Sequence, residues 1–157
     1  MIKLQVSNNN PAKETIYLEL RDFEAIVSLL VSLRKEFTED IPPFKTRYAG
    51  ILESIVAQIQ AEYFGKELYR GVVNKAVWMF YCLIKNHPFI NGNKRIAIVA
   101  LFTFLKLNCR EILLDENAIS NELYSIAVRT SERKPEEIES VKKYLKRKIR
   151  SFIMRFD

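Results

Sequence analysis

The segment HPFINGNKR, residues 87–95, interrupts the most apolar part of the chain. Apolar runs precede it at 77–84 and follow it at 96–105, and both have the composition of buried helices. Pro88 disfavours helical dihedral angles at His87, and Gly92 permits a left-handed backbone, so the chain is expected to turn here. The sequence therefore predicts two buried central helices joined by a short polar loop.

The second half of this segment has the features of an anion site. A helix that begins around Asn93 leaves its first amide groups without intrahelical acceptors, at the positive end of the helix dipole. Lys94 and Arg95 add two cations to the same turn. A phosphate suits such a site. His87, the only histidine of the chain, is placed to take a proton from an incoming hydroxyl. Taken singly, a histidine before a proline is more often a plain turn residue.

Together, these residues resemble the motif of the Fic/Doc family, HPFx(D/E/N)(G/A)N(G/K)R. All eight specified positions match, with Ile90 at the free one. The resemblance implies an all-α, Fic-type helical bundle that binds ATP and Mg²⁺ and modifies proteins. It implies catalytic roles for His87 and Arg95 and a metal-binding role for Asn91. The nucleotide phosphates would lie against Gly92, Asn93, Lys94 and Arg95. Phe89 is interpreted as the apolar anchor of the loop.

Two positions favour the Doc, or death-on-curing, branch of this family. Fic enzymes that transfer AMP usually have glycine at the position of Lys94 and a second arginine at the position of Ile98. The form with lysine resembles Doc toxins of toxin–antitoxin pairs. For these, the resemblance implies transfer of the γ-phosphate of ATP to a Ser or Thr hydroxyl of a target protein, a translation factor such as elongation factor Tu.

Two alternatives remain open, one within the family and one that Asn91 and the basic last helix suggest. The family often has Asp or Glu at this position, and Mg²⁺ prefers charged oxygen ligands. AMP transfer to a protein hydroxyl is one alternative, and a catalytically degenerate binding module is the other.

The chain also lacks the string (S/T)xxxE(G/N) with which many Fic proteins inhibit themselves. We therefore expect a small separate antitoxin as its regulator.

Composition limits the class of protein. The chain has 157 residues, 48% of them hydrophobic and 28% charged, with only 4 Gly and 5 Pro, which favours one helical domain. Its net charge of +6 suits an acidic partner, although direct nucleic-acid binding is not expected. Cys82 and Cys109 form no metal-binding set, and no run of apolar residues is long enough to span a bilayer. Residues 1–20 lack the apolar region of a secretory signal, so a cytoplasmic location is expected.

The remaining chain is expected to form an N-terminal extension and a helical domain. Residues 1–20 contain short alternating segments at 2–6 and 15–20, which suggest a small β-hairpin. Residues 21–157 form the Fic/Doc-like domain, whose closest resemblance covers about 41–129. The two central helices are expected at 72–86 and 93–107. Apolar periodicity predicts four more helices: at 22–37, at 51–64, from Asp115 onward, and from Pro135 to the end. Gly65 is the predicted C-cap of the helix at 51–64.

Two basic segments each have two interpretations. The loop that contains Lys45, Thr46 and Arg47 is either a flap that docks the target's backbone, as in Fic/Doc proteins, or an ordinary solvated loop. The last helix has a dense basic face. A solvated face or a dock for an acidic antitoxin is favoured there over nucleic-acid binding.

Overall fold

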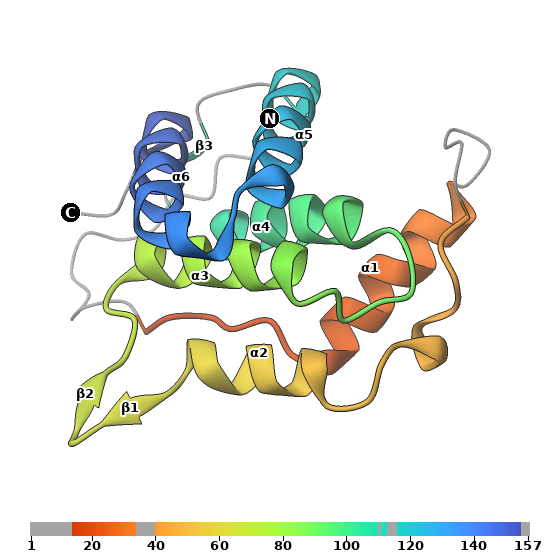
Figure 1. Cartoon of the computed structure of the whole chain (residues 1–157), viewed down its shortest axis with the longest axis horizontal. Coiled ribbons are helices and arrows are strands. Elements are labelled where there is room, and N and C mark those ends of the chain that lie inside the picture. Colours follow the sequence, from red (N-terminus) through yellow and green to blue (C-terminus); the bar gives the residue numbers. More distant parts are fainter. Residues whose placement is uncertain (1–13, 34–39, 110, 113–115, 155–157) are drawn as a thin grey trace.

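Helices α3 (Val72–Lys85) and α4 (Asn93–Asn108) lie side by side at the centre of the molecule, joined by the loop at 86–92 (Figure 1). The structure is a computed structural model that describes residues 14–33, 40–109, 111–112 and 116–154. Ten of the α3 residues are buried, and α4 buries a continuous stripe that includes Ile96, Ala100 and Phe104. The two predicted central helices are thereby confirmed.

Four further helices enclose this pair. Helix α1 (Leu20–Ser32) packs on α4, and α2 (Ile51–Ile59) packs on α3. On the other side, α5 (Glu116–Glu132) contacts both central helices, and α6 (Ile138–Phe152) contacts α3 (Figure 1). Short 3₁₀ turns at Phe44–Thr46 and Pro135–Glu137 precede α2 and α6. This arrangement is the all-α bundle that the sequence predicts.

The predicted helix at 51–64 is too long, and a hairpin replaces its end. Strands β1 (Glu62–Tyr63) and β2 (Lys66–Glu67) pair antiparallel. Phe64 and Gly65 both have positive φ, +50° and +74°, as a two-residue type I′ turn requires. Gly65 therefore belongs to a hairpin turn, and its prediction as a helix C-cap is wrong. A second short pair joins β3 (Glu111–Ile112) to β4 (Ile153–Met154).

The segment predicted as the second N-terminal strand does not form one. Residues 15–19 are irregular, and α1 already begins at Leu20; the other predicted strand, at 2–6, lies outside the described residues. The side chain of Asn108 takes the place of a neighbouring strand. Its amide oxygen accepts the Ile16 N–H at 2.8 Å, and its amide nitrogen donates to the Ile16 carbonyl at 2.8 Å. Asp115, the predicted helix cap, and residues 34–37 of the first predicted helix also lie outside the described residues.

Lys75 is a buried charge that apolar periodicity does not reveal. Its side chain is 1% exposed within α3. The ammonium group pairs with Glu67 at 3.1 Å and donates to the Tyr69 carbonyl. A buried charge is tolerated only when it is paired and hydrogen-bonded. Lys75 therefore fastens the β1–β2 hairpin to the central helix.

The two cysteines are expected to be unreactive in the folded protein. Both are buried and neither is part of a disulfide, and burial raises the pKa of the Cys82 thiol to about 12. Since the thiolate is the nucleophile, a thiol reagent at pH 8 should label neither cysteine of the native protein and both cysteines in denaturant. Rapid labelling of one equivalent before unfolding would contradict this burial.

No helix among the described residues is both long and apolar enough to cross a membrane.

Candidate active site

His87 stands at the start of the loop between α3 and α4 with an unusual backbone. Its φ is +47°, a left-handed conformation that is uncommon outside glycine. Its side chain is exposed, whereas Pro88 and Phe89 directly after it are buried. The change from exposed to buried within two residues holds the backbone of the loop in the core and leaves the imidazole accessible to a substrate.

Asn93 holds the loop closed from inside. Its side-chain oxygen accepts the Phe89 N–H at 3.0 Å, and its side-chain nitrogen donates to the Phe89 carbonyl at 2.8 Å. The same nitrogen lies 3.5 Å from Nδ1 of His87, at the outer limit of hydrogen bonding. Asn93 is buried, so it acts as a clamp under the loop rather than as an exposed ligand.

Phe89, the predicted anchor, is 4% exposed. Its ring lies 6.3 Å from that of Phe44, measured between centroids. The aromatic contact joins the motif loop to the segment that precedes α2.

The N-terminal turn of α4 directly follows the loop. Gly92 is the N-cap with φ +81°, and the Ile96 N–H bonds back to the Gly92 carbonyl. The amides of Asn93 and Lys94 precede the first intrahelical bond, as helix geometry dictates. The side chains of Lys94 and Arg95 are half-buried in the same turn. The structure thus brings the amide groups and the two cations together at one helix terminus.

Gly92 is needed for its size as well as its backbone. A Cβ atom there would lie 2.9 Å from Cγ1 of Ile41, closer than such contacts normally occur. Gly50 has the same φ of +81° but open space around it. Gly92→Ala should therefore destabilise the protein by about 1–3 kcal/mol, from left-handed strain plus the clash.

Gly50→Ala is the matched control, because it carries only the strain. Urea denaturation of the two variants should show a clearly larger loss for Gly92→Ala. Equal losses would mean that the contact with Ile41 is relaxed without cost.

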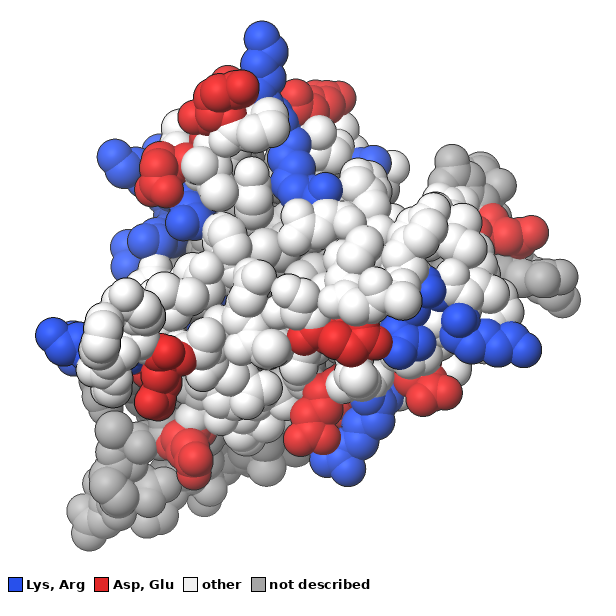
Figure 2. Space-filling view, turned by 60° about the horizontal axis from the view of Figure 1, so that its bottom comes forward, with Lys and Arg blue, Asp and Glu red and all other residues white. Residues whose placement is uncertain are grey.

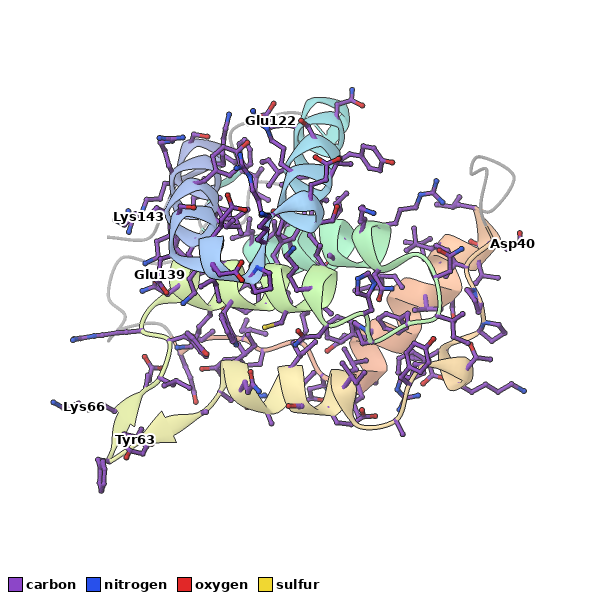
Figure 3. The ribbon with its side chains drawn as sticks, viewed as in Figure 1. Asp40, Tyr63, Lys66, Glu122, Glu139 and Lys143 are labelled. Atoms are coloured by element: carbon purple, nitrogen blue, oxygen red, sulfur yellow. The ribbon has the colours of Figure 1, made fainter. Side chains whose placement is uncertain are left out.

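A segment distant in sequence completes the site. Residues 40–48 lie against the motif loop, and Figure 3 shows Asp40 at the same end of the molecule as that loop. The Asp40 carbonyl accepts a hydrogen bond from the Asn91 side chain at 3.1 Å, and the Tyr48 N–H donates to the Pro88 carbonyl at 3.0 Å. Sequence reasoning placed a flap near this point but missed both contacts, which link residues 40 or more positions apart.

Asn91, the predicted metal ligand, is already engaged within the protein. Its amide oxygen accepts the Gly92 N–H at 2.9 Å, and its nitrogen donates to Asp40. An amide oxygen has a second lone pair, so one further interaction is possible. No group of three or more His, Cys, Asp or Glu side chains suited to a metal occurs in the part of the chain that the structure describes. Asn91 can therefore supply one neutral ligand to a metal that is carried largely by a nucleotide's phosphates.

The residues predicted as a docking flap form a compact turn. Phe44–Thr46 is a 3₁₀ turn in which Lys45 and Thr46 are exposed. The Arg47 guanidinium lies 4.1 Å from the centroid of the Phe44 ring and pairs with Glu53 at 2.7 Å. Arg47 is thus held by the fold, while Lys45 and Thr46 face solvent.

The pair of Arg47 and Glu53 is expected to stabilise the protein in a pH-dependent manner. The hydrogen bond from Arg47 lowers the pKa of Glu53 below its usual 4.5. The stabilisation is therefore fully present above pH 4.5 and is lost as the pH falls through the lowered value. Because both side chains are partly exposed, Glu53→Gln should cost about 0.5–1 kcal/mol at pH 7 and less at pH 3. A cost that is the same at both pH values in urea denaturation would contradict this linkage.

Comparison with known proteins agrees with this geometry. A sequence model of the Fic/DOC family matches residues 17–105, which include α1, α2, α3, the motif loop and most of α4. The chain is 37% identical over 71 residues to "Toxin Doc" of Mycolicibacterium smegmatis (strain ATCC 700084 / mc(2)155), covering 45% of this chain and 55% of the relative. The chain thus spans about half the length of the curated relative that it matches. No solved structure matches it.

The family match extends over more than half of the chain, and within it lie the exposed histidine, the clamped loop and the cationic helix terminus. The chain belongs to the Fic/DOC family.

Proposed function

We propose that this chain is a Doc-like toxin of a toxin–antitoxin pair. It transfers the γ-phosphate of ATP to a Ser or Thr hydroxyl of a target protein, a translation factor such as elongation factor Tu. The observation that carries this proposal is the juxtaposition of an exposed His87 with the α4 N-terminus and its two cations. The proposed target and antitoxin place the reaction in the cytoplasm.

His87 acts as the general base. One ring nitrogen takes the proton of the target hydroxyl as the hydroxyl oxygen bonds to the γ-phosphorus. The bond between that phosphorus and the bridging oxygen breaks, and ADP leaves. The clamp by Asn93 fixes the loop backbone, and hence the position of His87 relative to the phosphates.

The N-terminal turn of α4 holds the phosphates. The amides of Asn93 and Lys94 lie at the positive end of the helix dipole. The Gly92 amide donates to Asn91 in the structure and would exchange that bond for a phosphate oxygen. The Arg95 guanidinium stabilises the charge that develops at the transferring group. Asn91 would give Mg²⁺ one oxygen ligand, and the ion would neutralise phosphate charge.

Lys94 is the residue proposed to select phosphoryl over AMP transfer. Its side chain occupies space that glycine leaves open in AMP-transferring relatives. Because of this side chain, the bound nucleotide lies with its γ-phosphate, and not its α-phosphate, toward His87. AMP transfer is the second outcome that the test below must distinguish.

The exposed residues Lys45 and Thr46 are proposed to face the target protein beside the motif loop. Since the chain lacks the internal inhibitory string, a small antitoxin would restrain the activity. Copurification of the toxin with the product of a neighbouring small gene would support this partner.

The deciding experiment uses ATP labelled at either the α- or the γ-phosphate, incubated with cell extract and Mg²⁺. Protein labelled only from γ-labelled ATP supports the kinase proposal. Label only from the α-position means AMP transfer. No label with excess enzyme means a binding module with a degenerate site. The Asn91→Asp variant serves as a control, because it restores the charged ligand and should raise activity if Asn91 limits metal binding.

A further inference from the structure

Helices α5 and α6 enclose a hollow that the proposed activity does not use. Its volume is about 290 Å³, close to the lower end of small-molecule sites, and every residue that lines it belongs to these two helices or to the turn between them. The lining includes the three arginines Arg129, Arg133 and Arg147 together with the Tyr144 ring. We propose that this hollow binds a small ligand that carries phosphate groups.

The sequence spacing places these side chains at one opening. Arg129 lies in the last turn of α5 and Arg133 directly follows that helix, and both line the hollow. Tyr144 and Arg147 are three residues apart on α6 and share its face toward α5. The apolar positions Val141 and Leu145 of α6 are buried beneath them. The packing that buries α6 therefore also assembles the cationic opening.

Two of the arginines converge on Tyr144. Arg129 donates to the Tyr144 hydroxyl at 3.1 Å, and its guanidinium carbon lies 5.5 Å from the ring centroid. The guanidinium carbon of Arg147 lies 5.7 Å from the same centroid. Because its oxygen accepts from Arg129, the Tyr144 hydroxyl keeps its own proton to donate to a ligand.

The positive charge at this opening is only partly compensated. Arg133 pairs with Glu137 at 3.3 Å, and the nearby Glu122 is taken by Lys148 at 2.9 Å. Within the described residues, no carboxylate forms an ion pair with Arg129 or Arg147. Arginine is the side chain best suited to phosphate, because its planar fork can donate two parallel hydrogen bonds. An anion between the two guanidinium groups would relieve their mutual repulsion.

The surroundings favour a small ligand over a long polyanion. Glu132, Glu136 and Glu139 are exposed on the same turns and would repel an extended acidic peptide or a nucleic-acid backbone. Figure 2 shows the side of the molecule that includes α2, where acidic and basic side chains are likewise interspersed. A compact ligand that fits inside the hollow avoids these carboxylates.

The test titrates the ¹⁵N-labelled full chain with sodium pyrophosphate and follows backbone amide shifts. Saturable shifts are expected at residues 129–147, separate from any shifts at 92–95. Arg147→Gln should weaken the pyrophosphate affinity measured at 129–147 about tenfold or more, since it removes a charge-assisted contact. Arg150→Gln is the matched control, because Arg150 is exposed on the same helix and does not line the hollow. It should leave the affinity within about twofold.

Three outcomes would overturn the proposal. Equal weakening by Arg147→Gln and Arg150→Gln would mean general attraction to a basic helix. Shifts that do not saturate would mean that there is no built site. Tighter binding of a hexaglutamate peptide or a short RNA at 129–147 would mean that the surface serves a macromolecule. Shifts at 92–95 report on the motif in the same spectra, so loss of the proposed function and loss of this site can be told apart.

Discussion

The His87→Asn protein should lose transfer of phosphate to protein by a factor of about 100 to 10,000, the usual contribution of a general base. Asparagine is chosen because it tolerates the left-handed backbone at position 87, where φ is +47°. The substitution therefore removes the imidazole with little added strain. His87→Ala should show the same loss of activity, combined with a small loss of stability.

The measurement is the initial rate of γ-phosphate incorporation into protein, together with growth after induction. Urea denaturation of His87→Asn should match that of the unchanged protein, because the ring is exposed and its contact with Asn93 is long, at 3.5 Å. Growth arrest and incorporation that both survive in this variant would remove His87 from the mechanism.

The second large effect is expected from Asn93→Ala, and it concerns stability. The substitution leaves the Phe89 N–H and carbonyl without partners in a buried site. Each unsatisfied buried group costs about 1–3 kcal/mol, so the free energy of unfolding should fall by about 2–6 kcal/mol. Activity should fall as well, because the loop that carries His87 would no longer be held.

Asn91→Ala is the matched control for this prediction. Its hydrogen bond to Asp40 is exposed, and its bond to Gly92 is part-buried, so the loss should stay near or below about 1 kcal/mol. Urea denaturation of both variants gives the comparison. If Asn93→Ala costs no more than Asn91→Ala, the buried clamp does not hold the loop.

The elements that could be predicted from sequence are those with long apolar periodicity. Helices α3 and α4 each repeat apolar residues over four turns or so, and the loop between them contains a dense motif. The β1–β2 hairpin could not be separated from the end of α2 in this way, since Glu62, Tyr63 and Phe64 also continue the helical pattern of 51–59. Gly65 suits both a helix C-cap and a type I′ turn. The hairpin is held by an ion pair between the buried Lys75 and Glu67, a contact that the local sequence pattern does not reveal.

Long-range contacts explain the other points at which the structure differs from the sequence predictions. Residues 15–19 alternate like a strand, but their partner is the side chain of Asn108, 92 positions away from Ile16. The motif residues could be found from the sequence, whereas the roles of Asn93 as a clamp and of Gly92 against Ile41 depend on neighbours that only the fold supplies.

The hollow between α5 and α6 also depends on the fold, because the basic side chains of α6 point in different directions. Arg147 faces α5, Lys142 lies 4.9 Å from the centroid of the Trp78 ring, and Lys143 points outward (Figure 3).

The central claim is that residues 87–95 form a cradle for nucleotide phosphates with His87 beside it. The most direct measurement is a titration of the ¹⁵N-labelled protein with a non-hydrolysable ATP analogue and Mg²⁺. The largest saturable amide shifts should fall at 92–95, with a change in the ring signals of His87, and the α4 N-terminus should be protected from hydrogen exchange. Saturable binding that leaves 87–95 unchanged, or that shifts only residues of α5 and α6, would contradict the account.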